Sequence, residues 1–278
     1  MQRSALGLAA VAAALIFATA GARAFDDSKY PDFSGQWVRI GSGSFDPSKP
    51  GELGQQVPLI PEYKAIWEKS VADIANGGQG NNPMGRCIPP GMPRTMINYE
   101  GMEIVVTPPV TYILLQEPED QIRRIYTDGR PWPDDPAPAY LGHSHGQWVD
   151  DNGDGRYDAL LVETRAIKQP HTYDSSGAPF HADGRAVVKE RLSLDKADPN
   201  VLHDEITVLD HALTGPYTVM RSHRRSQHPS WVETVCSEEN HQVRIGTEAY
   251  YLDADGELMP TRKGQPPPNL RHFGEVKK

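Results

Sequence analysis

The sequence has few cysteines, no excess of basic charge and no long hydrophobic run after its first 24 residues. With 28 Lys and Arg against 37 Asp and Glu, its net charge is −9. Binding to nucleic-acid phosphates requires a basic surface. The densest basic stretch, RSHRR at 221–225, reads as a solvated strand face. We therefore expect no nucleic-acid partner.

Several catalytic motifs are also missing. The sequence contains no glycine-rich phosphate loop after a strand, no nucleophile-elbow serine and no Cys-x-x-Cys pair. These motifs supply phosphate binding, covalent serine catalysis and thiol redox chemistry. Their absence argues against nucleotide cofactors and against a serine nucleophile.

Residues 1–24 have the pattern of a secretory signal peptide. Arg3 precedes an apolar run from Ala5 to Ala20, and Ala-Arg-Ala ends the segment. The run is short for a membrane span, which needs roughly 20 residues. We expect cleavage after Ala24, no membrane span in the mature chain, and a periplasmic or secreted location. Cleavage would remove two arginines and no acid, which moves the net charge from −9 to −11.

The two cysteines, Cys87 and Cys236, both lie in the mature part of the chain. In an oxidising compartment, an even pair outside any metal-binding motif most simply forms one disulfide. The alternative is a free catalytic thiol, but no cysteine–histidine signature surrounds either residue. We therefore predict a Cys87–Cys236 disulfide that closes a long loop.

The chain after residue 100 is a series of strand-like segments with period-two alternation. Turn sequences such as TDGR, NGDG and DADGE separate them. Together with SGQWVRI near the start, and with WVETVC and HQVRIGTEAYYLD at the end, they make about ten strands. We predict a mainly β fold, an antiparallel meander closed into a barrel, with a sandwich as the alternative. The barrel domain would span 25–260, and the polar, Pro-rich tail 261–278 would be loosely ordered.

One segment breaks the β pattern. PEYKAIWEKSVADIANGG, at about 61–78, has proline in its first turn and two glycines at its end. Its apolar residues follow a helical period, which predicts one amphipathic helix before the main strand series. The side chains expected to be buried are Ile66, Trp67, Val71 and Ile74.

Two sets of residues resemble known families. The Gly35-Gln36-Trp37 triplet on the first predicted strand resembles the opening signature of lipocalin-type barrels, in which the tryptophan plugs one end. The blocks RCIPPGMPR, RRIYTDGR and GHSHGQW resemble those of a large uncharacterised group of exported bacterial proteins with lipocalin-like β-barrel character. The resemblance implies an exported, lipocalin-like barrel and leaves its chemistry open. His145 departs from the group, which usually has an apolar residue there.

The stretch LGHSHGQW places two histidines on one face of a strand. Residues two apart point the same way, so His143 and His145 lie opposite Trp148. If Trp148 faces an apolar layer, we expect the two histidines to line the barrel lumen. They could then act as an acid–base pair or hold zinc. A zinc site needs a third ligand, and the candidates are Glu163, His181 and Glu190.

The loop sequence HTYDSSGAPFHADG supplies Asp174 and His181, which match blocks of the resembling group. A carboxylate that orients an imidazole suits proton transfer near neutral pH. Alternatively, Asp174 caps a turn through the backbone and His181 packs at the loop edge. Both interpretations remain open from the sequence.

Glu190 stands in an otherwise apolar row with Val188 and Leu192. A carboxylate buried without a partner is costly. Glu190 therefore either pairs with a base such as Arg124 or is a protonatable group with a raised pKa. Tyr126 shares the strand face of Arg124 and could supply a hydroxyl, and Glu163 in LLVET raises the same question as Glu190.

The turn DDNGDGRYD invites a calcium interpretation. Asp150, Asn152, Asp154 and Asp158 fit positions of an EF-hand-like loop. Position twelve, however, is Leu161, where a bidentate Glu is required, and strands flank the turn. The alternative is a hairpin turn with acidic side chains.

These residues predict a cofactor-independent acid–base enzyme of lyase, isomerase or hydrolase type, acting on a small apolar or aromatic compound in the barrel cavity. The predicted catalytic residues are His143, His181, Asp174, Glu190 and Arg124. The predicted ligand-binding residues are His145, Tyr126 and Glu163. One alternative is a non-catalytic periplasmic ligand-binding protein, and another is a structural protein whose barrel is filled by side chains.

Overall fold

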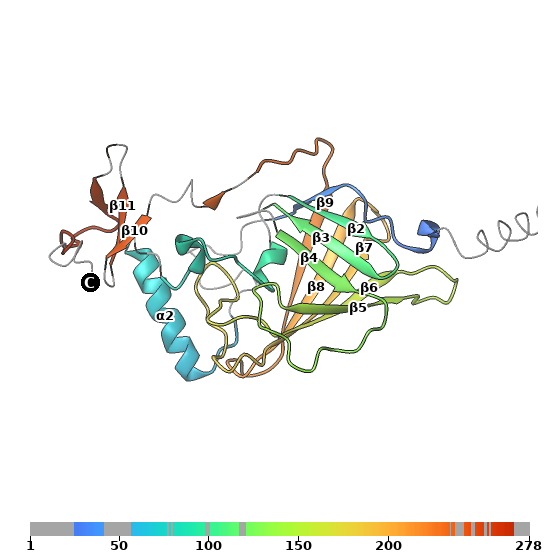
Figure 1. Ribbon diagram of the computed structural model, residues 1–278, viewed down its shortest axis with the longest axis horizontal. Helices are drawn as coiled ribbons and strands as arrows, with labels where there is room; N and C mark the ends of the chain where they lie inside the picture. The colour runs from blue at the N-terminus through green and yellow to red at the C-terminus, as the bar shows by residue number, and fades with distance from the viewer. Residues whose placement is uncertain are drawn as a thin grey trace, which may run out of the picture.

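Nine strands form a closed barrel on one side of the molecule (Figure 1). The computed structural model describes residues 25–41, 57–76, 78, 80–97, 101–116, 121–233, 235–236, 242–245, 248–252, 255 and 257–269. The predicted signal peptide, 1–24, and the end of the tail, 270–278, lie outside the described residues. The predicted mainly β barrel is confirmed.

Each barrel strand pairs with the next along the chain, and the last pairs with the first. The barrel closes where Trp37 lies opposite Arg225. In chain order the strands are β1 (Gln36–Arg39), β2 (Gly101–Val106), β3 (Val110–Leu115), β4 (Gln121–Tyr126), β5 (His143–Val149), β6 (Ala159–Arg165), β7 (Val187–Leu194), β8 (Val201–Leu209) and β9 (Tyr217–Arg225).

One strand pairing corrects the predicted antiparallel meander. β4 and β5 run parallel, with Ile125 opposite Ser144 and Tyr126 opposite His145. Parallel neighbours need a crossover connection, because a tight turn can join only antiparallel strands. The Pro-rich segment 127–142 is that connection, and it brings the chain back beside the last residues of β4, where β5 begins.

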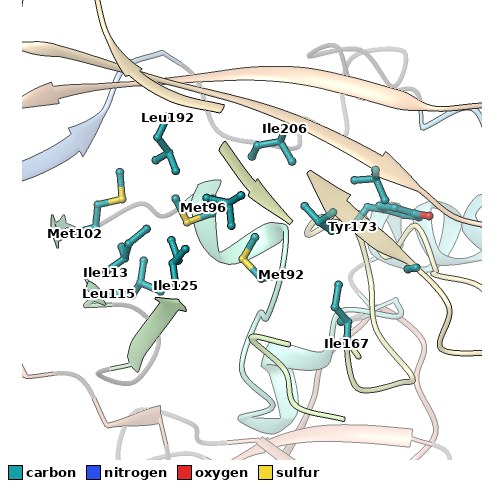
Figure 2. Packing of buried hydrophobic residues seen from close by; sticks show 14 of the residues in the cluster. Met92, Met96, Met102, Ile113, Leu115, Ile125, Ile167, Tyr173, Leu192 and Ile206 are labelled. Carbon is teal, nitrogen blue, oxygen red and sulfur yellow. The ribbon is translucent and has the colours of Figure 1, made fainter. Parts of the chain in front are cut away.

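The barrel interior is largely filled by apolar side chains. Period-two alternation sends one side chain in two inward, so each strand contributes to a shared core. Met92 and Met96, from the segment before β2, enter between the strands (Figure 2). The buried strand residues around them include Met102, Ile113, Leu115, Ile125, Leu192 and Ile206. Burying each large apolar side chain stabilises the fold by about 1.5–3 kcal/mol.

Trp37 closes the end of the barrel at which β1 begins. Its side chain is 1% exposed, and Nε1 donates to the Phe33 carbonyl oxygen at 2.9 Å. The Arg225 guanidinium lies over its ring, 4.4 Å from the centroid. Phe33 packs in turn against Trp148 of β5. Trp148 therefore points into the barrel, and this fixes the directions of His143 and His145 on the same strand.

The predicted helix is α2 (Pro61–Ala75), and it lies beyond the barrel end rather than on the barrel wall (Figure 1). It packs against the loop between β6 and β7. Trp67 Nε1 donates to Ser176 Oγ at 2.8 Å, and Ser70 Oγ donates to the Ser176 carbonyl oxygen at 2.9 Å. Ser70 is the buried residue of the helix, whereas Ile66 is 41% exposed. The expectation that Ile66 is buried was therefore wrong. The helix meets the β6–β7 loop through hydrogen bonds from Trp67 and Ser70 to Ser176, and Ile66 takes no part in them.

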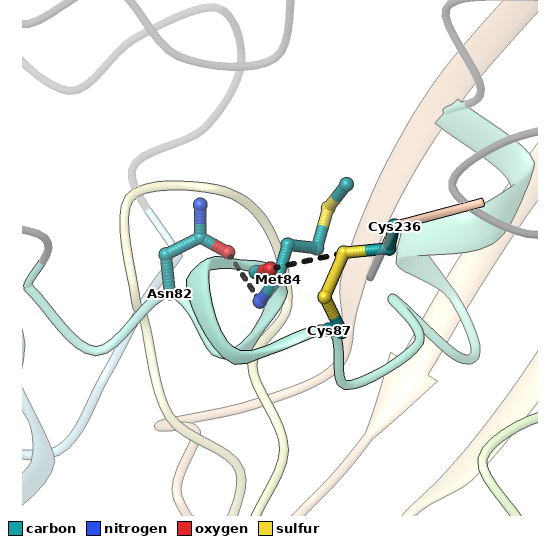
Figure 3. Close-up of a disulfide and its surroundings, with 4 residues drawn as sticks. All are labelled: Asn82, Met84, Cys87 and Cys236. Carbon is teal, nitrogen blue, oxygen red and sulfur yellow. Dashed lines mark hydrogen bonds between the residues drawn. A yellow bond between two sulfur atoms is a disulfide. The ribbon is translucent and has the colours of Figure 1, made fainter. Parts of the chain in front are cut away.

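The predicted disulfide joins Cys87 to Cys236, with 5.6 Å between their Cα atoms (Figure 3). Cys87 ends the short 3₁₀ helix η2 (Pro83–Arg86) in a left-handed conformation, with φ at +54°. Cys236 follows the barrel strands. The bond therefore ties the segment that precedes β2 to the segment that follows β9.

A separate three-stranded sheet lies outside the barrel and contains β10 (Gln242–Ile245), β11 (Glu248–Leu252) and β12 (Leu258–Pro260). The predicted strand HQVRIGTEAYYLD therefore supplies a hairpin to this sheet. WVETVC forms no strand element among its described residues. The described part of the tail packs on the small sheet, where Arg262 donates to both carboxyl oxygens of Glu248. Among the described residues, no helix has the length and apolar character needed to cross a membrane.

Candidate functional site

His143 and His145 face the outside of the barrel, which corrects the expectation that they line its lumen. Between them, the buried Ser144 points inward and hydrogen-bonds Thr164 at 2.8 Å. Trp148 packs against the core on the same inner side. Because alternate residues point to opposite faces, the histidines must point outward. His143 Nε2 lies 3.0 Å from the Ala137 carbonyl oxygen of the crossover.

The three predicted ligand-binding residues do come together, but on the outer face of the barrel. His145 pairs across the sheet with Tyr126 on one side and with Glu163 on the other. Trp132 from the crossover stacks on the His145 ring at 3.9 Å. Partial burial and then the charge of Arg130 lower the pKa of His145. Trp132, His145 and Glu163 border an open depression of about 460 Å³.

Glu190 is buried inside the barrel and pairs with Arg123, not with Arg124. Both Glu190 oxygens accept from the Arg123 guanidinium, one of them at 2.8 Å, and the two side chains are 0% and 1% exposed. Arg123 also donates to Thr164 Oγ1 at 3.0 Å and contacts Ser144. Alternation along β4 points Arg124 outward together with Tyr126, so Arg123, one position earlier, is the cation that points inward.

Asp204 of β8 is a second carboxyl group in the interior, next to Glu190. It is 0% exposed, and neither of its oxygens has a hydrogen-bond donor among the residues that the structure describes. Burial and then the negative charge of Glu190 raise the pKa of Asp204 well above its ordinary value. Two neighbouring carboxyl groups share a site only if one of them holds a proton. Burial beside Glu190 therefore makes Asp204 hold its proton to a higher pH than an ordinary aspartate does.

Two basic side chains of β9 lie on the inner face of the barrel, and one of them is next to this acid. Arg221 lies opposite Asp204 in the register, and burial lowers its pKa. His223 is 1% exposed, and neither ring nitrogen makes a hydrogen bond of good geometry to any residue that the structure describes. Burial, followed by the charges of Arg39 and Arg221, lowers the pKa of His223 to about 4. The imidazole is therefore neutral near pH 7.

We call Glu190, Asp204, Arg221 and His223 the interior polar cluster. A buried polar group without a hydrogen bond costs about 1–3 kcal/mol. Native proteins keep such groups where water, a ligand or a reaction uses them. The unpartnered atoms of this cluster therefore mark the strongest candidate site in the described part of the barrel.

Sequence reasoning found Glu190 and missed the other three members. The same signal was present for Asp204, which stands in a row with Leu202, Ile206 and Val208. Arg221 and His223 belong to RSHRR, which was read as a solvated strand face. That interpretation was wrong for these two residues, because β9 closes the barrel and turns this face inward.

Asp174 and His181 do not form the predicted catalytic pair. Asp174 is 3% exposed and accepts from the Ser176 amide at 2.9 Å and from its hydroxyl. Burial raises the pKa of Asp174, and the Ser176 hydrogen bonds oppose that shift. His181 instead contacts Asp183 and His211. Of the two alternatives for Asp174, the structure therefore has the turn-capping one.

His181, Asp183 and His211 form a cluster where two loops meet at one end of the barrel. His181 Nδ1 lies 3.1 Å and His211 Nδ1 lies 2.6 Å from Asp183 Oδ2. Hydrogen bonds from the Arg185 amide and the two imidazoles outweigh the effect of burial and lower the pKa of Asp183 to about 2. Among the described residues, this is the one group of three metal-ligating side chains with converging ligand atoms. His143, His145 and Glu163 do not form such a group.

The acidic turn between β5 and β6 is organised by its own backbone. Asp150 accepts from the Gly153, Asp154 and Gly155 amides, at 2.7, 3.3 and 2.8 Å. Asp158 accepts from the Asp151 amide at 2.7 Å. Asn152 and Asp154 are also hydrogen-bonded within the turn. These bonds explain the acidic residues as turn-forming groups, and calcium binding stays a prediction.

These features define a closed nine-strand β-barrel protein with a polar cluster buried in its interior. The chain matches no model of a known protein family, no curated protein and no solved structure. Its function must therefore be inferred from its own geometry.

Proposed function

We propose that the chain is a small-molecule enzyme whose packed barrel opens to admit a substrate, with Asp204 as the proton donor. The observation that carries the proposal is the fully buried Asp204 carboxyl, which has a raised pKa and no hydrogen-bond donor among the residues that the structure describes. A carboxylic acid kept protonated near neutral pH is the equipment of a general acid. The reaction is of lyase, isomerase or hydrolase type and needs no nucleotide.

The neighbours of Asp204 fit this role. Arg123 forms an ion pair with Glu190, and the negative charge of Glu190 raises the pKa of Asp204. When Asp204 gives its proton to a substrate oxygen, it becomes a carboxylate beside the Arg221 guanidinium. A buried cation stabilises such developing charge more strongly than it would in water. The carboxylate can then take a proton from a substrate carbon, which completes an isomerisation without any other reagent.

The surroundings favour an apolar or aromatic substrate with one polar group. Ile206 is two positions from Asp204 on β8, Leu192 lies opposite Asp204 on β7, and both are buried. Met96 packs in the same interior (Figure 2). Apolar walls with a few convergent polar groups are typical of small-molecule sites. The proposal keeps Glu190 from the sequence prediction and moves the other catalytic roles from His143, His181, Asp174 and Arg124 to Asp204 and Arg221.

A non-catalytic ligand-binding protein is the second candidate, and one observation favours it. With a pKa lowered to about 4, His223 is neutral but a weak base. The interior then offers an acid and a hydrogen-bonding imidazole without a strong base. Such a set can hold a ligand without changing it.

Incubation of the purified mature chain with an extract of small molecules, followed by untargeted mass spectrometry, separates the two candidates. Three proteins are compared: the wild type, Asp204→Asn, and the matched control Asp195→Asn, whose carboxyl lies on an exposed turn. We expect the wild type and Asp195→Asn to convert one compound that Asp204→Asn leaves intact. Retention of a compound unchanged by all three would favour the binding candidate. Equal conversion by Asp204→Asn and wild type would refute the role of Asp204.

We also propose that the protein works outside the cytoplasm. The Cys87–Cys236 disulfide supports this, because disulfides persist in oxidising compartments. The leader-like residues 1–24 support it as well. Intact-mass measurement of the protein from its producing cells should give a chain that begins at Phe25 and has no titratable thiol. A chain that keeps residues 1–24 would contradict the proposal.

A further inference from the structure

We propose that His181, Asp183 and His211 bind one divalent transition-metal ion, of which zinc is the best fit, at the end of the barrel. This site is separate from the interior polar cluster and does not depend on the proposed enzyme function. It joins two segments that lie 28 or more positions apart in the sequence, the β6–β7 loop and the turn after β8.

The three ligand atoms already converge. The Nδ1 atoms of His181 and His211 lie 3.1 and 2.6 Å from Asp183 Oδ2, and all ligand atoms lie within 4.8 Å of one another. Zinc bonds of about 2.0–2.1 Å place tetrahedral ligands roughly 3.3 Å apart. Shifts of about 1 Å or less in side chains that are partly exposed would therefore complete the coordination.

The two imidazole nitrogens meet the same carboxylate oxygen, which is the arrangement that a metal ion would use. His181 Nδ1 and His211 Nδ1 both lie within hydrogen-bond distance of Asp183 Oδ2, and the Asp183 amide lies 3.3 Å from His181 Nδ1. A proton can bridge each of these contacts when no metal is bound. Because histidine binds a metal through a deprotonated ring nitrogen, an ion held by these three atoms would take the place of the bridging protons.

Other contacts hold the ligands in place. The Arg185 amide donates to Asp183 Oδ1 at 3.0 Å, which leaves Oδ2 for the ion. Asp210 Oδ2 accepts from the His181 amide at 2.9 Å and also from the Tyr173 hydroxyl. The Tyr63 ring packs on the His181 ring at 5.3 Å. Supporting interactions of this kind orient the ligands of metal sites.

The donor set and the exposure indicate which ion binds and how openly. Two imidazole nitrogens and one carboxylate oxygen suit zinc and the neighbouring late first-row metals, whereas calcium prefers an all-oxygen shell. The His211 side chain is 63% exposed, so at least one coordination position faces solvent. Three protein ligands with an open position are typical of zinc sites that bind a further ligand. Beside His211 lies an open depression of about 290 Å³, bordered by Arg185 and Pro216.

The test uses the tag-free mature chain and cobalt(II), whose visible absorption reports coordination by protein ligands. His211→Ala removes one ligand, and its exposed side chain makes loss of folding an improbable cause of any effect. The matched control is His203→Ala. His203 Nε2 also lies 3.2 Å from a carboxylate, that of Asp195, but no second imidazole joins that pair.

We expect the wild type and His203→Ala to bind one equivalent of cobalt(II) with the absorption of a four- or five-coordinate ion, and zinc to displace it. His211→Ala and Asp183→Asn should weaken binding at least tenfold, with unchanged circular dichroism. Absence of stoichiometric binding by the wild type would overturn the proposal. Equal binding by His211→Ala and the wild type would overturn it as well. Neither outcome bears on Asp204, whose test measures conversion of a compound without added metal.

Discussion

Replacement of Arg123 by Met should strongly destabilise the barrel. The substitution keeps an apolar stem of similar length and removes the guanidinium that both Glu190 oxygens contact. Glu190 would then be left in the interior beside Asp204 with no paired cation. It would have to take up a proton or draw water into the core, because an isolated buried charge is far more costly than a paired one.

The magnitude follows from burial. The Arg123 and Glu190 side chains are 1% and 0% exposed, so solvent screens the pair very little. Breaking a buried ion pair by removing one partner costs about 3–5 kcal/mol. In a domain of this size, 1 kcal/mol corresponds to roughly 2–4 °C in Tm. We therefore expect Arg123→Met to lower Tm by about 6–20 °C.

Urea denaturation followed by tryptophan fluorescence measures the free energy of unfolding for three variants. Arg123→Met should lose about 3–5 kcal/mol, whereas Arg123→Met with Glu190→Leu should recover most of that loss, since no charge is stranded. The control Arg165→Met breaks the exposed pair with Glu163 and should cost about 0–1 kcal/mol. The reasoning is refuted if Arg123→Met stays within about 1 kcal/mol of the wild type, or if the double variant is no more stable than the single one.

Three further predictions concern the disulfide, a buried histidine and a constrained glycine. Replacing Cys87 and Cys236 by Ser should cost about 5 kcal/mol by loop entropy, because 149 positions separate them; denaturation midpoints that do not differ between the variant and the oxidised wild type would contradict this. Burial lowers the folded-state pKa of His171 from 6.5 to about 4, so the unfolded state binds the proton first as pH falls, and up to about 3 kcal/mol of stability is lost between about pH 6.5 and pH 4. In His171→Gln, the urea midpoints at pH 7 and pH 5 should differ less than in the wild type, and an unchanged difference would count against this role of His171. Gly91→Ala should cost more than Gly129→Ala, since both have positive φ but only the first Cβ would meet backbone, 2.6 Å from the Tyr140 carbonyl oxygen; equal thermal shifts would show that this contact is relieved.

Local patterns in the sequence were enough to predict most of the elements. Alternating apolar residues and explicit turns predicted a mainly β barrel of about the observed size, and proline and glycine signals bounded α2. The pairing of Cys87 with Cys236 followed from their number alone. These predictions held because period, turn chemistry and cysteine count are properties of short segments or of the whole composition.

The candidate site was predicted less well. Alternation correctly grouped His143 with His145, and it correctly showed that Glu190 stands in an apolar row. It placed the histidines in the lumen, because no local pattern distinguishes the concave face of a strand from its convex face. It also selected Arg124 as the partner of Glu190, although the register between β3, β4 and β5 turns Arg123 inward.

The sequence by itself determined the strands, the single long helix, the pairing of the cysteines and the presence of a carboxylate in an apolar row. Only the tertiary structure decided that β4 and β5 run parallel, that β9 places Arg221 opposite Asp204 and buries His223, and that His211 meets His181 and Asp183. The physical reason is that closing a sheet into a barrel chooses which face is inside and which loops meet at its ends. Both choices depend on contacts between residues far apart in the chain, and no short stretch of sequence contains them.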